Sequence, residues 1–384
     1  MKIYLYIVTA LFLYGILTAC SNEPAVLTNI VQDKQSNKQK ENLEVVKVEG
    51  KEKRDTALLK ENARFQFEVI DGERNYTLFL FAEDEQSEYE GKNQLYKGHY
   101  SLFLAEKDAT VAYKQTALQG IDDFTFQDSS EQVFPLNLGN KTVIAILQSA
   151  GAYQSIPLFL AVKDGEIKAV QSADVLPIMY GTEIKTINQK YLQTALFNEN
   201  NEWVFTTWEL NKEKLSLLKF DESLLGKAYH NGRSGDNWYS IWSEKKENYF
   251  PFANLELTKN DIKKAKQGIP LGSTYPIGIN ITNIKKAEPN YMEEGIIEGI
   301  PYVMYPEITY LYNQTTGTVT AVSIPGERMK TTMKEIIHLF GEPDYERNEE
   351  STSDQTAIYV ANKYRIEINA SLDGEVLNIY LQKK

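Results

Sequence analysis

The residue with the clearest chemistry in this chain is Cys20, its one cysteine. It follows Leu17-Thr18-Ala19, after a start of Met1-Lys2 and an uncharged apolar run from Ile3 to Leu17. A basic start, an apolar segment of about 7–15 residues and small residues before a cut define a secretory signal peptide. A cysteine thiolate at the cut is a nucleophile that can take a lipid. We therefore expect residues 1–19 to be removed and Cys20 to be acylated.

This interpretation predicts where the protein is located. A transmembrane anchor needs roughly 20 apolar residues, and the run Ile3–Leu17 is shorter. One acyl chain gives marginal binding, and stable anchoring takes two signals. A diacylglycerol thioether on Cys20, with palmitate-type chains, would supply both. We expect a lipid-anchored protein on the extracytoplasmic face of the cell membrane, whose body has no disulfide and no thiolate metal site.

The rest of the chain contains no recognisable reaction motif. Its three histidines, His99, His230 and His338, stand far apart, and no HExxH or paired-histidine spacing occurs. A GxSxG elbow, a Walker loop and GxGxxG are also absent. We therefore predict that the protein is not an enzyme and takes no cofactor and no metal. The acid pair of a glycosidase can come from distant segments, so a cell-wall hydrolase is kept as an alternative.

Aromatic residues gather between Tyr229 and Phe252, where half of the four tryptophans lie. Trp238, Tyr239 and Trp242 stand there among polar residues, and such aromatics make interface hot spots. They form the candidate binding surface of the chain. Tryptophan and tyrosine also close the end of a β domain or join it to its neighbour, and packing between domains is the interpretation that we favour.

The charge balance argues against nucleic acid as a partner. The chain has 41 Lys and Arg against 53 Asp and Glu, and no cluster of basic residues of the kind that holds a polyanion. Residues 21–62 carry eight charges of each sign and no aromatic residue. Such a segment cannot bury enough surface to fold. We expect a disordered tether over residues 20–62, which would hold the body about 35 Å from the bilayer.

Residues 63–250 are predicted to form a β-rich domain. Short apolar runs alternate with turn residues, and the sequences LFLAEKDATVA from Leu102 and LFLAVKDGEIKAV from Leu158 match at a spacing of 56. A third hairpin is expected at Trp203–Phe220. Repeats of this length are typical of propeller blades, but a closed propeller needs about 4–8 of them. A propeller-like sheet array and a β-sandwich both stay open. The clearest strands are Tyr76–Phe81, Tyr100–Ala105, Thr142–Leu147, Ile156–Val162, Glu166–Val170 and Trp203–Leu210.

Residues 251–384 are predicted to form an α+β domain that is built from two repeats of one unit. The segment Ala287–Tyr291 matches Gly341–Tyr345 at a spacing of 54, and Gly317 matches Gly374 at 57. Each copy is predicted to contain a helix, a Glu-Pro turn and a meander of strands. The second helix has a capping box at Thr332 and ends at Gly341. In the first copy Ile277, Ile281 and Ile284 keep a helical spacing, and Thr258 with Asp261 caps a separate helix before Gly268.

These residues resemble a tandem module of the β-lactamase-inhibitor-protein type. The family's relatives include small outer-membrane assembly lipoproteins and secreted proteins of Gram-positive bacteria. The resemblance covers about residues 255–384 and rests on TMKEIIHLFGEPDY and IYVANKYRIEINASLDGEVLNIYL. It implies a concave sheet that docks on other proteins and performs no chemistry.

We therefore expect a Gram-positive cell-surface lipoprotein that binds an extracytoplasmic protein partner. The alternatives are a solute-binding lipoprotein of a transporter and the cell-wall hydrolase. The chain is short of the long alternating helices that solute-binding proteins contain.

Overall fold

The structure is a computed structural model that describes residues 46–48, 51–118, 123–127, 130–151, 153–172, 178–225, 233–349 and 354–384. The described residues all belong to one compact unit, Glu44–Lys384. The expected signal segment, Cys20 and residues 21–45 of the expected tether lie outside the described residues. No helix in the described ranges is long and apolar enough to cross a membrane.

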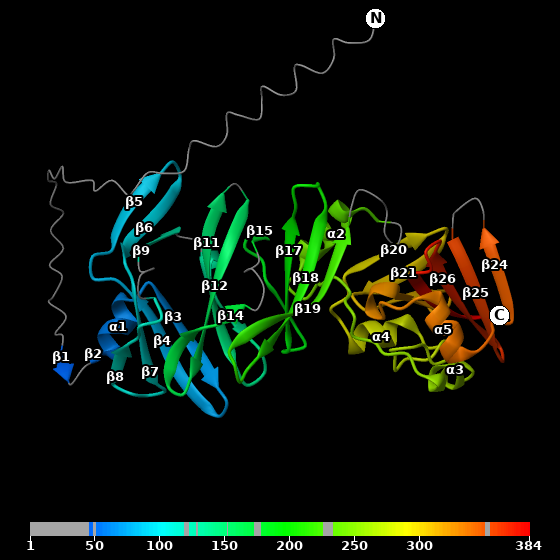
Figure 1. Ribbon diagram of the computed structural model, residues 1–384, viewed down its shortest axis with the longest axis horizontal. Helices are drawn as coiled ribbons and strands as arrows, with labels where there is room; N and C mark the ends of the chain where they lie inside the picture. Colours follow the sequence, from blue (N-terminus) through cyan, green and yellow to red (C-terminus); the bar gives the residue numbers. More distant parts are fainter. Residues whose placement is uncertain are drawn as a thin grey trace, which may run out of the picture. The chain divides into compact units, whose positions relative to one another are not determined.

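Over the described residues, strand (53%) far outweighs helix (14%), which confirms the predicted β-rich fold class. The first sheet contains six strands in the order β1-β2-β8-β7-β4-β3 (Figure 1). A separate three-stranded sheet has the order β5-β6-β9. In the chain, β5 and β6 come between β4 and β7, and β9 follows β8. The bounds are β1 Val46–Val48, β2 Lys51–Asp55, β3 Phe65–Asp71, β4 Arg74–Phe81, β5 Gln86–Glu90, β6 Asn93–His99, β7 Ser101–Glu106, β8 Val111–Lys114 and β9 Asp123–Gln127.

Residues 51–62 differ from the expected tether, because they form β2 and the helix α1 (Thr56–Asn62). The Asp55 carboxylate accepts a hydrogen bond from the Ala57 amide at 2.7 Å and so caps α1. Leu59 is fully buried, and α1 contacts β2 and β4. The segment has too few apolar residues to fold alone, and the first sheet supplies the surface on which it folds.

The second and third sheets are four-stranded antiparallel meanders, each with one added strand, and the strand added to the third sheet, β14, pairs in parallel. The second has the order β10-β11-β12-β13, with β15 paired to β12, and the third has the order β14-β19-β18-β17-β16. The six strands predicted from sequence all lie in the first three sheets. The bounds are β10 Val133–Asn137, β11 Thr142–Gly151, β12 Gln154–Lys163, β13 Glu166–Ala169, β14 Gln171–Ser172, β15 Met179–Tyr180, β16 Lys185–Ile187, β17 Tyr191–Phe197, β18 Trp203–Asn211 and β19 Ser216–Leu225, with a 3₁₀ turn η1 at Ser130–Gln132.

The second sheet is covered on both faces. Ile144 and Ile146 of β11 belong to a core shared with the first sheet. Val143 and Leu147, which point to the opposite face, belong to a core shared with Trp208 of the third sheet. A strand buried on both sides has an almost continuous apolar sequence, as TVIAIL in β11 does. The described sheets therefore pack in series, and they form no closed propeller ring.

The C-terminal sheet has eight strands in the order β20-β21-β22-β23-β27-β26-β25-β24. The helices α4 and α5 are each followed by four strands, and the last strand of each set, β23 or β27, lies at the centre. The bounds are α2 Gly235–Glu244, α3 Lys259–Ala265, α4 Ile281–Ala287, β20 Glu293–Ile297, β21 Ile300–Tyr305, β22 Ile308–Tyr312, β23 Val319–Pro325, η2 Gly326–Arg328, α5 Met333–Phe340, β24 Tyr345–Glu349, β25 Asp354–Ala361, β26 Tyr364–Ser371 and β27 Val376–Lys383.

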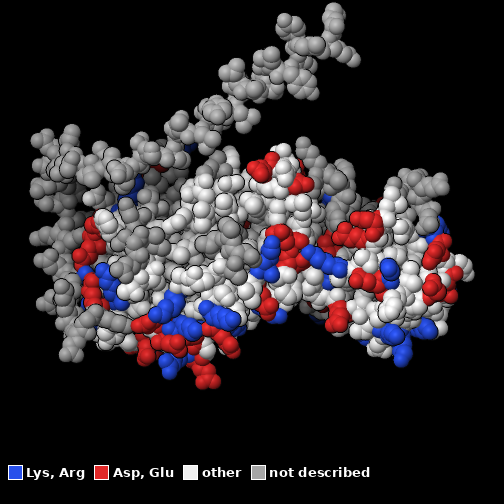
Figure 2. Space-filling view, viewed as in Figure 1, with Lys and Arg blue, Asp and Glu red and all other residues white. Residues whose placement is uncertain are grey.

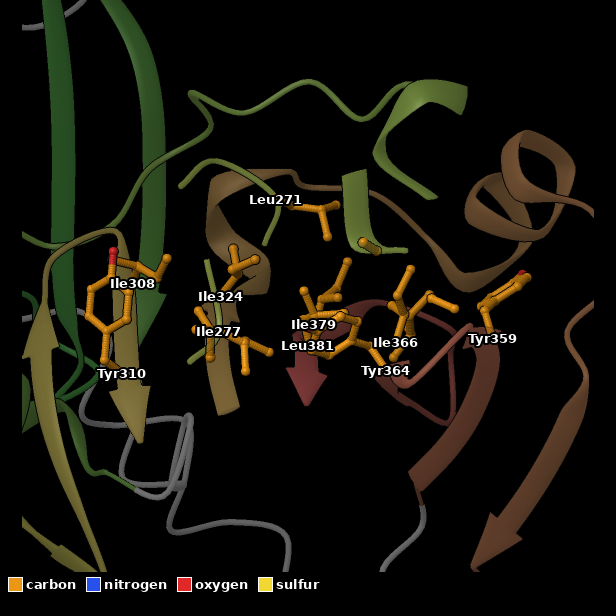
Figure 3. Packing of buried hydrophobic residues seen from close by; sticks show 14 of the residues in the cluster. Leu271, Ile277, Ile308, Tyr310, Ile324, Tyr359, Tyr364, Ile366, Ile379 and Leu381 are labelled. Carbon is orange, nitrogen blue, oxygen red and sulfur yellow. The ribbon is translucent and has the colours of Figure 1, made fainter. Parts of the chain in front are cut away.

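One face of this sheet carries the core that α3, α4 and α5 cover. Figure 3 shows part of this core, with Ile366, Ile379 and Leu381 close together. Ile366, Ile368 and Ile379 are fully buried in it. The predicted capping box of α5 is present, with the Glu335 carboxylate accepting from the Thr332 amide at 2.8 Å. The box at Thr258 is also present and opens α3. The first-copy helix starts later than its isoleucine spacing suggested, since Asn280 caps it and Ile277 lies before it.

Candidate functional site

The tryptophans of the expected binding surface are buried, and this corrects the expectation. Trp238 and Trp242 lie on α2 and are 4% and 0% exposed. Tyr239, between them, is half-buried and stacks on Trp203 of the third sheet at 3.7 Å between ring centroids. Residues four apart share one face of a helix, so α2 buries both tryptophans together. They cannot act as a docking surface.

The core around α2 instead joins the third sheet to the C-terminal sheet. It contains Phe205 from the third sheet together with Met292 and Met304 from the region of β20 and β21. The Trp242 indole donates to Gln193 Oε1 at 3.0 Å. This agrees with the packing role that the sequence favoured for these aromatics.

Charged groups strengthen the same junction. The Lys185 ammonium donates to the Lys245 carbonyl at 2.8 Å and lies 4.6 Å from the centre of the Trp242 ring. Burial lowers the pKa of Lys185, although Glu183 opposes the shift. Further along, Lys330 pairs with the buried Asp221 of β19. The Asp221 carboxylate also accepts from the Ala253 amide at 3.0 Å.

The surface that remains for a partner is the face of the C-terminal sheet opposite its helices from β22 to β24, here called the open face. At β21 the same face is covered, because Met304 packs in the core around α2. The side chains of the open face alternate along each strand with those of the helix-covered core. Strand register aligns them in rows that cross the sheet, and one such row is Thr309, Ser323, Tyr380, Glu367, Ile358 and Tyr345. A second row is Leu311, Ala321, Gln382, Arg365 and Val360, and a third is Pro325, Asn378, Asn369, Thr356 and Arg347.

The open face is chemically mixed. Most of its residues are half-buried, whereas Tyr345 at its edge is 65% exposed. Neighbouring polar groups hold one another: the Asn369 amide donates to Asn378 Oδ1 at 2.9 Å, and the Gln382 amide donates to Glu367 Oε2 at 3.1 Å. Apolar and aromatic groups lie among them. A surface with both kinds of group in fixed positions can bind a protein by shape and hydrogen bonding.

Figure 2 shows acidic and basic side chains interspersed on one side of the molecule, without a broad area of Lys and Arg alone. Within the described ranges, no group of three or more His, Cys, Asp or Glu residues could hold a metal ion. His99 lies on β6, where its Nδ1 is 2.5 Å from Asp84 Oδ2. His338 is exposed on α5, and His230 lies outside the described residues.

No protein-family profile matches the chain, and no curated protein matches it. Among solved structures, it is similar to a DUF4309 family protein, YjgB, from Bacillus subtilis subsp. subtilis str. 168. The two share 15% identity with a TM-score of 0.29, over 33% of this chain and 95% of that one. A likeness this weak carries no argument.

The individual residues of the open face were not predictable from the sequence. The strand periodicity in YRIEINAS of β26 marks Arg365, Glu367 and Asn369 as facing away from the core. This periodicity predicts which residues share a face of the sheet. It does not predict that helices cover one face and leave the other face partly exposed to solvent.

Proposed function

We propose that this chain is a membrane-tethered, extracytoplasmic lipoprotein that binds another protein and performs no reaction of its own. The observation that carries the binding part is the open face of the C-terminal sheet. It presents three aligned rows of partly exposed side chains, while α3, α4 and α5 support the sheet from the other side. A rigid sheet loses little conformational entropy on binding.

The order of elements supports a duplicated module of the inhibitor type. A helix followed by four strands occurs twice, and the two sets meet at β23 and β27. Each helix begins beside the glycine turn before its last strand. The Ile281 amide donates to the Gly317 carbonyl, and the Met333 amide donates to the Gly374 carbonyl, both at 2.8 Å. Joining two such units doubles the width of the face that a partner meets.

The tethering part of the proposal rests on Leu17-Thr18-Ala19-Cys20. The solute-binding alternative has less support, because the longest described helix, α2, has ten residues, whereas proteins of that class alternate strands with long helices. A cell-wall hydrolase would be recognised by activity on peptidoglycan or polysaccharide in a direct screen.

The tether is tested by the Cys20→Ser variant, followed by cell fractionation and metabolic labelling with a palmitate analogue. We expect the wild-type chain to be labelled and membrane-bound, and the variant to be unlabelled. Equal labelling and attachment of both chains would refute lipidation at Cys20.

Docking is tested by photo-crosslinking in native cells from single positions in the full chain. A photoreactive residue replaces Tyr380 or Asn369 on the open face, or Lys334 or Lys263 on the exposed sides of α5 and α3. We expect a discrete protein adduct from the first pair only, and its loss when Ser323→Arg is added. Adducts of the same pattern from both pairs, or adducts that Ser323→Arg leaves unchanged, would refute docking on this face.

A further inference from the structure

A separate cavity lies on the helix side of the C-terminal sheet. It has a volume of about 570 Å³, within the range of small-molecule sites. Four parts of the chain build it: the segment after α2, the loop after α3, the end of α4, and the hairpin between β21 and β22. Its aromatic lining residues are Tyr249, Tyr275, Tyr305 and Tyr310.

The tyrosines meet edge to face. The Tyr305 and Tyr310 ring centroids are 5.9 Å apart with an interplanar angle of 85°, and those of Tyr275 and Tyr310 are 6.4 Å apart at 73°. Their hydroxyls are tied to the protein. Tyr305 donates to the Glu288 carbonyl at 2.7 Å, and Tyr310 shares a hydrogen bond of 3.1 Å with Ser273. Tyr305 and Tyr310 are almost fully buried, at 7% and 2% exposed. The half-buried Tyr275 therefore presents the ring face that a ligand can reach.

The charge of the lining has one sign. Glu247, Glu288 and Glu307 line the cavity, and no Lys, Arg or His is among its lining residues. Glu307 is compensated by Arg328, at 3.1 Å, whereas Glu288 is exposed at the end of α4. Burial, and then the negative charge of Glu288, raises the pKa of Tyr310 to about 12. Burial and the same carboxylate also raise the pKa of Tyr305.

A tyrosine next to the cavity shows which group these rings attract. Tyr291 packs on Tyr305, with centroids 6.4 Å apart. The ammonium groups of Lys285 and Lys245 lie 4.9 Å and 5.2 Å from the centre of the Tyr291 ring. A cation is attracted to the face of an aromatic ring by the ring quadrupole. The chain's own ammonium groups already use this interaction at the rim.

We propose that the tyrosine-lined cavity binds a small organic cation through an ammonium group, held by the ring face of Tyr275 and by the carboxylate of Glu288. A neutral ligand of the same shape would make the same apolar contacts. It would lack the cation–π attraction to the ring and the attraction to the Glu288 carboxylate. The site lies on the opposite side of the sheet from the open face, so it does not depend on protein docking there.

The test uses choline and its uncharged isostere 3,3-dimethyl-1-butanol, titrated against the full chain in a neutral detergent and followed by ligand-observed NMR. We expect millimolar binding of choline and at least about tenfold weaker binding of the isostere. Tyr275→Ala and Glu288→Gln should each weaken choline binding several-fold, whereas Tyr275→Phe should retain it because the ring face is kept. Thermal melting would verify that each variant is folded.

The matched controls are Tyr89→Ala and Glu298→Gln, which alter an exposed tyrosine and an exposed glutamate outside the cavity lining. Neither should change the affinity. Equal affinity for the two probes, no choline binding, or losses that are the same in the control variants would each overturn the proposal. Preferential binding of a neutral sugar such as glucose would overturn it as well.

Discussion

The second sheet and the C-terminal sheet are both antiparallel, but they differ in how many of their faces the protein covers. In the second sheet, β11 is buried on one side by the core of the first sheet and on the other by that of the third. In the C-terminal sheet, helices cover one face, and the other, from β22 to β24, keeps mostly half-buried polar and aromatic side chains. A sheet enclosed on both sides can only support structure, whereas one with a free face can also bind.

The largest effect that this comparison predicts is on the free energy of unfolding. Ile146→Ala removes a fully buried side chain from β11 and should cost about 2–5 kcal/mol. Tyr380→Ala on the open face should cost less, about 1 kcal/mol, because its side chain is only half-buried. Chemical denaturation of both variants measures the difference. Similar costs at the two sites would break the distinction between the two sheets.

A smaller effect concerns the junction that fixes the C-terminal sheet to the third sheet. Lys330→Met leaves the buried carboxylate of Asp221 without its cation. The carboxylate keeps two backbone amide donors, from Ala253 and Glu222. We therefore expect a loss of about 2–3 kcal/mol, below the usual cost of breaking a buried pair.

The matched control for this junction is Lys334→Met, which alters an exposed lysine of α5. It should change stability by no more than about 0.5 kcal/mol. If both lysine variants unfolded at the same denaturant concentration, Lys330 would not stabilise the junction.

A still smaller effect concerns the helix that covers the core face of the C-terminal sheet. Thr332→Ala removes the side-chain cap of α5 and should destabilise the protein by about 1 kcal/mol. Thr332→Ser keeps the hydroxyl and should restore most of the loss. Denaturation midpoints of the two variants check this. An alanine variant as stable as the serine variant would argue against a capping contribution.

The smallest effect is expected at the edge strand β20 and depends on pH. A hydrogen bond from Lys285 at 2.7 Å holds the pKa of Glu294 below its usual 4.5. A lowered folded-state pKa contributes stability that is present above pH 4.5 and is lost as pH falls through the folded value. Glu294→Gln should therefore lower the melting temperature slightly at pH 7 and less at pH 3. A difference that grew on acidification would have the wrong sign.

Much of the local structure was predictable. The apolar runs at Thr142–Leu147 and Ile156–Val162 became strands, and the capping box at Thr332 opens a helix. These features depend on residues close in sequence, where side-chain periodicity and capping decide the conformation. Residues 51–62 were missed, because the helix α1 with its buried Leu59 packs against β4, which comes later in the chain.

The candidate site was less predictable. Trp238 and Trp242 stand among polar residues in the sequence, as tryptophans of a binding surface often do. In the structure, however, the third sheet and the C-terminal sheet enclose them. The tyrosines of the cavity are scattered from residue 249 to residue 310, and nothing in their spacing brings them together. The Glu-Pro segment at Ala287–Tyr291 did stand out as a repeat, and it forms part of the cavity wall.

The sequence by itself determined the type of most elements, the periodicity of each strand and the caps of α3 and α5, because these follow from interactions within a few residues. The tertiary structure alone decided which sheet faces are covered, which aromatics are buried, and where Glu288 meets the tyrosines. The reason is physical: burial depends on the surfaces that distant segments bring together, and a residue's type does not specify which segment will cover it.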